Sequence, residues 1–112
     1  MKSFKDLGLS EETLSVLKTK GFEEPTPIQE QTIPVLLSGK KDIIGQARTG
    51  TGKTAAFGLP LIELLSERSK SVQAIVLTPT RELAIQVAEE INSLKGSKKL
   101  RTVPIYGGQA IS

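Results

Sequence analysis

The fold of this chain is decided by one stretch, Ala47-Arg48-Thr49-Gly50-Thr51-Gly52-Lys53-Thr54. It follows a short apolar run at residues 42–45, which suits a buried strand, and it precedes a helix predicted over about residues 52–68. Its glycines permit backbone conformations closed to other residues, so successive N–H groups can point inward at phosphate oxygens. A glycine-rich loop between a strand and a helix is the setting of a P-loop, although the strict pattern has glycine where this chain has Ala47.

The residues that end this loop carry the chemistry of phosphate binding. The N-terminus of the following helix is positive and attracts anions. Lys53 can place its ammonium group on the β- and γ-phosphates of ATP, and the Thr54 hydroxyl can ligate Mg²⁺. The alternative is a glycine-rich turn that binds nothing, but the position between a strand and a helix favours nucleotide binding.

Capping residues and apolar periodicity predict three further helices, at about residues 10–21, 26–39 and 80–96. Ser10, Thr26 and Thr80 are the predicted N-caps, and Pro27 suits the first helical position. Inside the helix at residues 52–68, Pro60 should produce a kink or a restart. The last helix has one apolar face, formed by Leu83, Val87, Ile91 and Leu94.

Strands are predicted between the helices. Residues 72–77 form a near-continuous apolar run, as expected of a parallel strand that is covered on both faces. Residues 101–106 are predicted to form another strand, stopped by Gly107-Gly108. Strands that alternate with helices predict an α/β fold, with parallel strands flanked by helices.

Composition excludes several classes of function. The chain has no cysteine and no histidine, so disulfides, thiolate zinc sites and Ser-His or Cys-His catalysis are absent. No apolar run is long enough to span a bilayer and the start lacks a secretory signal, so we expect a cytoplasmic protein. The net charge of +3 includes a basic cluster, which is either a solvated loop or a nucleic-acid contact: Lys95, Lys98, Lys99 and Arg101.

Several segments resemble the motifs of DEAD-box ATP-dependent RNA helicases, in the order and spacing of that family. Residues 47–54 resemble motif I, including the alanine at its start, and residues 21–29, GFEEPTPIQ, resemble the Q motif with Phe4 as the upstream aromatic residue. Residues 79–84, PTRELA, resemble motif Ia, and Gly107-Gly108 resembles the glycine pair after the next strand. The resemblance covers essentially the whole chain.

The resemblance implies the first part of a RecA-like P-loop sheet. Residues 1–40 would be the helical Q-motif region, and residues 41–112 would be an incomplete P-loop core. In the family fold, later strands lie between the P-loop strand and the motif Ia strand. We therefore expect unpaired strand edges, and a chain that is marginally stable or that associates.

The Q motif implies recognition of adenine by Gln29, with Phe22 packed near the face of the base. A side-chain amide offers a donor and an acceptor, which match adenine N7 and N6. Gln29 also lies three residues after Thr26, so it fits a capping box. The alternative for Phe22 and for Phe4 is packing in the core, and for Phe4 this is the favoured interpretation.

The segment that resembles motif Ia and the glycine pair imply contact with an RNA backbone, without reading of its sequence. The alternatives are a helix cap, solvated charges and a simple turn. The implied RNA-contacting residues are Pro79, Thr80, Arg81, Glu82, Gly107 and Gly108.

The sequence lacks groups that ATP hydrolysis requires. The family supplies them as Asp-Glu-Ala-Asp, Ser-Ala-Thr and a second RecA-like domain, and no such segment occurs in these 112 residues. Glu63, Glu67, Glu89 and Glu90 are expected to be exposed charges on helices. The first interpretation is therefore a portion of an RNA helicase that is inactive alone. The alternatives are a non-catalytic adenine-nucleotide-binding fragment and an unrelated P-loop NTPase, which would have no need of Gln29.

Overall fold

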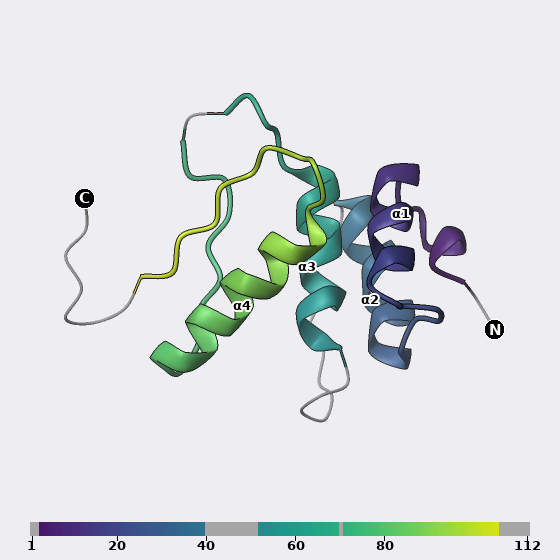
Figure 1. Cartoon of the computed structure of the whole chain (residues 1–112), viewed down its shortest axis with the longest axis horizontal. Helices are drawn as coiled ribbons and strands as arrows, with labels where there is room; N and C mark the ends of the chain where they lie inside the picture. Colours follow the sequence, from purple (N-terminus) through teal and green to yellow (C-terminus); the bar gives the residue numbers. More distant parts are fainter. Residues whose placement is uncertain (1–2, 40–51, 70, 106–112) are drawn as a thin grey trace.

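A computed structural model describes residues 3–39, 52–69 and 71–105 of the chain. Helix α3 lies between α2 and α4 (Figure 1). Helix α1 also contacts α4, where Lys20 at the end of α1 donates a hydrogen bond to Ser93 in the last turn of α4. No helix within the described ranges is both long and apolar enough to cross a membrane. The helical elements are a 3₁₀ turn η1 (Phe4–Leu7), α1 (Glu11–Thr19), α2 (Pro27–Ser38), α3 (Lys53–Leu64) and α4 (Arg81–Leu94).

The predicted helix starts are confirmed by their hydrogen bonds. The Ser10 side chain accepts a bond from the backbone N–H of Thr13 at the start of α1. Thr80 does the same for the N–H of Leu83 at the start of α4. Thr26 caps α2. These hydroxyls satisfy N–H groups that a helix cannot pair internally, which is why short polar residues define all three starts.

Helix α3 differs from its prediction at its C-terminal end. It ends at Leu64 rather than near residue 68, and it continues through Pro60 without a restart. The early end is explained by a contact from outside the helix, because the Gln73 side-chain amide pairs with the backbone of Ser66. Gln73 Oε1 accepts from Ser66 N at 2.8 Å, and Gln73 Nε2 donates to Ser66 O at 2.8 Å. The burial of Pro60 in the core offsets the backbone hydrogen bond that proline removes.

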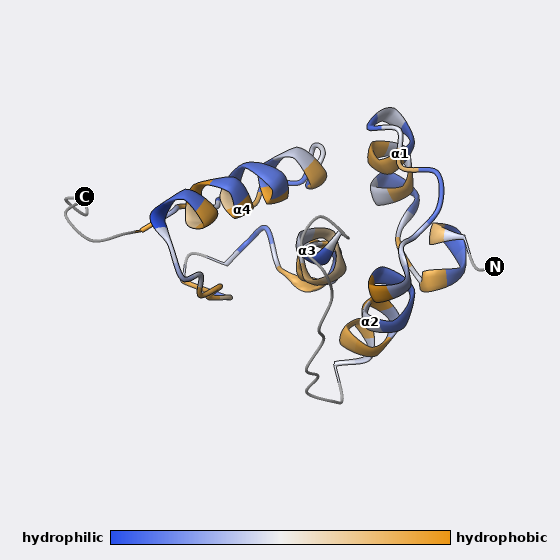
Figure 2. Cartoon of the chain, turned by 90° about the horizontal axis from the view of Figure 1, so that it is seen from below, coloured by the Kyte–Doolittle hydropathy of each residue, from blue (hydrophilic) through white to orange (hydrophobic). Residues whose placement is uncertain are grey.

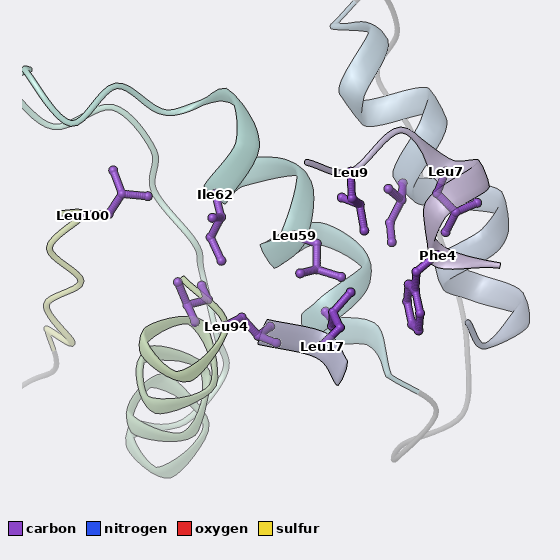
Figure 3. Close-up of a cluster of buried hydrophobic side chains, with 11 residues drawn as sticks. Phe4, Leu7, Leu9, Leu17, Leu59, Ile62, Leu94 and Leu100 are labelled. Atoms are coloured by element: carbon purple, nitrogen blue, oxygen red, sulfur yellow. The ribbon is translucent and has the colours of Figure 1, made fainter. Parts of the chain in front are cut away.

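The core is built around α3. Figure 3 shows Leu59 and Ile62 of α3 among Leu94 of α4 and Leu17 of α1, and all four side chains are at most 2% exposed. The apolar face predicted for α4 is confirmed at three of its four residues, since Ile91 and Leu94 are buried and Val87 packs against the same cluster. Leu83, in the first turn, is instead 40% exposed. Figure 2 shows this face opposite the hydrophilic face of α4. Burial of such side chains is the dominant favourable term in folding.

The predicted strands are not formed in the described part of the chain. Residues 72–78 and 101–105 have no assigned secondary structure, so the predictions of strands there are wrong and the incomplete sheet is not confirmed. The predicted P-loop strand at residues 42–45 lies outside the described residues. The physical reason is that a strand is stabilised by cross-strand pairs, and an apolar run without neighbouring strands gains nothing from extension.

These two segments expose apolar side chains. Val72 is 80% exposed, Ile75 is 78% exposed and Leu77 is 90% exposed, while Val103 and Ile105 are also more than half exposed. Exposed apolar side chains on extended, unpaired segments favour association.

We therefore expect the chain to self-associate as its concentration rises. Replacing both Ile75 and Leu77 by lysine should shift it toward monomer, because charges on an exposed extended segment oppose edge-to-edge pairing. Sedimentation velocity over a concentration series measures this. The matched control adds the same two charges at exposed polar positions, Gln31→Lys with Gln86→Lys, and should associate like the parent chain. A parent chain that stays monomeric throughout the series would contradict the prediction.

Candidate functional site

Gln29 joins the start of α2 to the start of α3. Its side chain is 3% exposed, and its Oε1 accepts a hydrogen bond from Thr26 N at 2.9 Å. Thr26 Oγ1 in turn accepts from Gln29 N at 3.4 Å, so the predicted capping box is confirmed. The remaining amide nitrogen, Nε2, donates to the carbonyl oxygen of Gly52 at 3.3 Å. One side chain therefore caps α2 and also contacts the residue that precedes α3.

Gly52 is the N-cap of α3, and glycine is required there for two reasons. Its φ of 87° lies in the left-handed region, which side chains with a Cβ rarely adopt. A Cβ at this position would also lie 2.3 Å from Gln29 Nε2 and 3.3 Å from Thr26 Oγ1. The glycine therefore permits the close approach of Gln29 to the P-loop backbone.

Lys53 and Thr54 occupy the first two positions of α3. Lys53 is exposed, and the Thr54 side chain is half-buried. Because Gln29 of the first α2 turn contacts Gly52, the N-termini of α2 and α3 lie close together. Both ends carry partial positive charge, and the Lys53 ammonium adds a full charge beside them. This arrangement attracts an anionic group such as a phosphate.

Phe22 is held rigidly behind α1. Gly21 N donates to Lys18 O at 3.1 Å and Phe22 N donates to Leu17 O at 2.9 Å, which closes the helix with Gly21 at a φ of 82°. The half-buried Phe22 ring lies 6.4 Å from the ring of Phe4, centroid to centroid. Phe4 itself is 5% exposed, which confirms its interpretation as a core residue.

The predicted RNA-contacting residues that the structure describes lie at the exposed N-terminus of α4. Pro79, Thr80, Arg81 and Glu82 are all exposed, and Thr80 Oγ1 accepts from Leu83 N at 3.2 Å. The helix-cap interpretation of Thr80 is therefore confirmed, and it leaves the surrounding surface accessible. The predicted site residues outside the described part of the chain are Ala47, Arg48, Thr49, Gly50, Thr51, Gly107 and Gly108.

The basic cluster near residue 98 has a structural role for two of its members. Lys98 Nζ donates to the carbonyl oxygens of Ile62 and Glu63 at the C-terminal end of α3, where cations stabilise the helix. Lys95 Nζ donates to Leu100 O at 2.6 Å. Nucleic-acid contact is therefore not needed to explain these two lysines.

A cleft of about 510 Å³ lies next to the candidate nucleotide site. It lies between Lys20, Thr54 and α4, and neither Gln29 nor Lys53 lines it. Glu89 and Glu90 contribute carboxylates to its wall, which disfavours a phosphate there. Within the described ranges, no group of three or more potential metal ligands comes together.

Glu63 is the residue that sequence reasoning missed. The expectation of an exposed helical charge is wrong, since its carboxylate is partly buried and accepts three hydrogen bonds from Ser10 and Thr13. Glu67 lies beyond the end of α3, where its Oε1 accepts from Lys99 N at 2.6 Å. No local signal in the sequence points to Glu63. The third helical position after the N-cap Ser10 is Thr13 rather than the glutamate of a capping box, but this does not show which residue elsewhere in the chain meets the cap.

Comparison with known proteins identifies the family. The DEAD/DEAH box helicase family matches residues 26–112, and the chain belongs to that family. It is 55% identical over 111 residues to a DEAD-box ATP-dependent RNA helicase, CshA, of Geobacillus kaustophilus (strain HTA426). That match covers 99% of this chain and 24% of the relative. The chain thus spans about a quarter of the length of this curated relative.

Solved structures agree with this assignment. The chain resembles the crystal structure of a DEAD box protein from Methanococcus jannaschii with a TM-score of 0.92 and 56% identity, over 96% of this chain and 30% of that one. It also resembles Saccharomyces cerevisiae Dbp5 bound to RNA and ADP BeF3, with a TM-score of 0.79 and 41% identity, over 85% of this chain and 25% of Dbp5. The described helices therefore adopt the arrangement seen in DEAD-box helicases.

The contact between Gln29 and Gly52 should contribute to the stability of the chain. Gly52→Ala should destabilise the chain through the left-handed backbone, at about 1–2 kcal/mol, and further through loss of the Gln29 hydrogen bond, at about 1–3 kcal/mol. Gly39→Ala is the matched control, because Gly39 has a φ of 66° and nothing within 4 Å of the added Cβ. Urea unfolding measures both variants. Equal losses would show that Gln29 does not pack against Gly52.

Proposed function

We propose that this chain is the portion of an ATP-dependent RNA helicase that binds ATP and part of an RNA backbone. Residues 1–40 would supply recognition of the base, and residues 41–112 would supply the phosphate loop and the start of the RNA surface. The observation that carries the proposal is the hydrogen bond from Gln29 to Gly52, which brings these two parts together. A cytoplasmic location and a second RecA-like domain in the whole protein belong to the same proposal.

Gln29 retains the groups needed to recognise adenine. Its Nε2 has two hydrogens and gives one to Gly52, and its Oε1 has two lone pairs and uses one for Thr26. One donor and one acceptor remain, and they match adenine N7 and the N6 amino group. Because Gln29 is 3% exposed, the base must displace the atoms that cover it. Phe22 lies in the loop between α1 and α2 and would pack against the base.

The start of α3 fits a triphosphate with Mg²⁺. Lys53 is exposed and can reach the β- and γ-phosphates, and the half-buried Thr54 hydroxyl can supply one ligand to the metal. Magnesium keeps several waters and takes substrate phosphates as ligands, so a single protein hydroxyl fits its needs. The metal would neutralise charge on the phosphates. The loop residues Ala47, Arg48, Thr49, Gly50 and Thr51 would complete the cradle with backbone N–H groups.

The exposed start of α4 supports contact with RNA. Pro79, Thr80, Arg81 and Glu82 surround a helix N-terminus, which suits a phosphate group, and Gly107-Gly108 would form the neighbouring contact. Contacts of this kind position a strand without reading its sequence. Dbp5, the relative seen with RNA and ADP BeF3, provides a precedent within the family.

A second candidate function is adenine-nucleotide binding without turnover. It is favoured by the sequence, since no acidic residue directly follows the apolar run at residues 72–77, and hydrolysis needs a carboxylate that helps to hold Mg²⁺. The two functions share the same binding site and differ only in hydrolysis.

Nucleotide selectivity tests the binding site. The chain should bind ADP more tightly than GDP, and Gln29→Ala should remove a preference worth roughly 1–3 kcal/mol. Lys53→Ala should weaken both nucleotides alike, because the phosphates are common to both. Thr26→Ala is the matched control, since it removes the helix cap and keeps the Gln29 amide. Calorimetric titration measures each variant, and equal affinities for ADP and GDP in the parent chain would exclude the proposed role of Gln29.

Hydrolysis tests the second candidate. We expect the 112-residue chain to release no phosphate from ATP with Mg²⁺ and single-stranded RNA. The reason is that Lys53 and Thr54 can stabilise charge and metal, but no residue of the sequence is placed to position the attacking water. A phosphate-release assay compares the chain with Lys53→Ala. Turnover clearly above that control would reveal a catalytic group within these residues.

A further inference from the structure

Glu63 is a partly buried carboxylate that the proposed nucleotide chemistry does not use. It lies in the last turn of α3, at the opposite end of this helix from Lys53. Its Oε1 accepts hydrogen bonds from Ser10 N at 3.0 Å, from Ser10 Oγ at 2.9 Å and from Thr13 Oγ1 at 2.5 Å. We call these three residues the α1 clamp.

The clamp has favourable electrostatics. Glu63 stands at the positive N-terminus of α1, where a carboxylate is stabilised by the helix dipole. Partial burial is the largest influence on its pKa and raises it. Hydrogen bonds from Thr13 and Ser10, with the charge of Lys98, outweigh the burial and lower the pKa of Glu63 below its ordinary value of 4.5. The carboxylate is therefore charged at neutral pH, and its three hydrogen bonds are charge-assisted.

The position of Phe22 follows from the position of α1. The backbone bonds from Gly21 to Lys18 and from Phe22 to Leu17 fix Phe22 to the last turn of that helix. A rotation or shift of α1 must therefore carry the Phe22 ring with it.

The other polar contacts of α1 are made to the end of α4 and the loop that follows. Lys20 Nζ donates to Ser93 Oγ at 2.8 Å, and Ser97 Oγ donates to Glu12 Oε1 at 2.5 Å. A Cβ on Gly96 would lie 2.7 Å from Val16 Cγ2, so the Gly96 backbone also packs closely against a side chain of α1. Among the described residues, the clamp supplies the hydrogen bonds that connect α1 to α3, the helix that begins at the P-loop.

We propose that Glu63 is a positioning residue for the adenine end of the nucleotide site. By holding the N-terminus of α1 against α3, it sets the place of Phe22 relative to Gln29 and Gly52. The inference rests on the proposed function, because it assumes that a base packs against Phe22. Glu63 touches no nucleotide and acts only through α1.

The test compares a ligand that has a base with one that has none. ADP and pyrophosphate both occupy the phosphate loop, but only ADP reaches Phe22. Glu63→Ala should weaken ADP binding by about three- to tenfold, the size of one aromatic packing contact, and leave pyrophosphate binding unchanged. Competition against a fluorescent ADP analogue measures both ligands on the 112-residue chain. Glu63→Gln, which keeps one accepting oxygen, should restore part of the loss.

A second variant of the clamp serves if Glu63→Ala does not fold, and a third variant is the control. Thr13→Val preserves the volume of a buried side chain and removes one donor of the clamp, so it should produce the same selective loss of ADP affinity. Glu67→Gln is the matched control, since Glu67 is bonded to Lys99 and to no residue of α1. It should leave both affinities unchanged.

The outcomes separate this inference from the proposed function. If Glu63→Ala and Thr13→Val weaken ADP and pyrophosphate equally, or change neither, Glu63 has a structural role only and the inference is wrong. A parent chain that binds ADP no more tightly than pyrophosphate overturns the proposed base recognition, and the inference with it. Selective loss of ADP affinity in both variants, with Glu67→Gln unchanged, supports both.

Discussion

Helix α3 has apolar residues on most of its surface, and this constraint organises the rest of the chain. Gly58, Leu59 and Pro60 are all buried, although consecutive residues of a helix point in directions about 100° apart, so cover on one side alone cannot bury all three. The helix must therefore be covered by α2 on one side and by α4 on the other, as Figure 1 shows. The residues at its start that we propose bind phosphate are held by this core, and a rigid helix positions them more accurately than a free loop would.

The meeting of α2 and α3 produces the candidate site. Hydrophobic packing brings the two helices together, but it does not by itself specify how their starts are aligned. Gln29 supplies that alignment, because its amide must satisfy hydrogen bonds to both Thr26 and Gly52 in a buried position. Gly52 makes the approach possible by having no side chain. In the proposed function, this one buried amide would couple recognition of the base to binding of the phosphates.

The extended segments differ from the helices in how their backbone hydrogen bonds can be satisfied. Helices satisfy their backbone hydrogen bonds internally, so α1 to α4 can form wherever an apolar face finds a partner. A strand depends on a neighbouring strand, and the apolar runs at residues 72–77 and 101–105 have none assigned among the described residues. The structural similarity to a DEAD box protein from Methanococcus jannaschii therefore includes the packing of the helices and the path of the chain, in addition to the similarity in sequence.

The sequence by itself determined the starts of the helices, most of the apolar face of α4 and the family. Ser10, Thr26 and Thr80 specify helix starts through bonds to residues three positions away, and such local interactions can be predicted from spacing. The tertiary structure alone decided three other features: the end of α3 at Leu64, the absence of strands at residues 72–77 and 101–105, and the role of Glu63. Each depends on atoms that are distant in sequence or on the absence of a partner strand. Glu63 lies 53 residues from Ser10, and no local pattern specifies that these two residues meet.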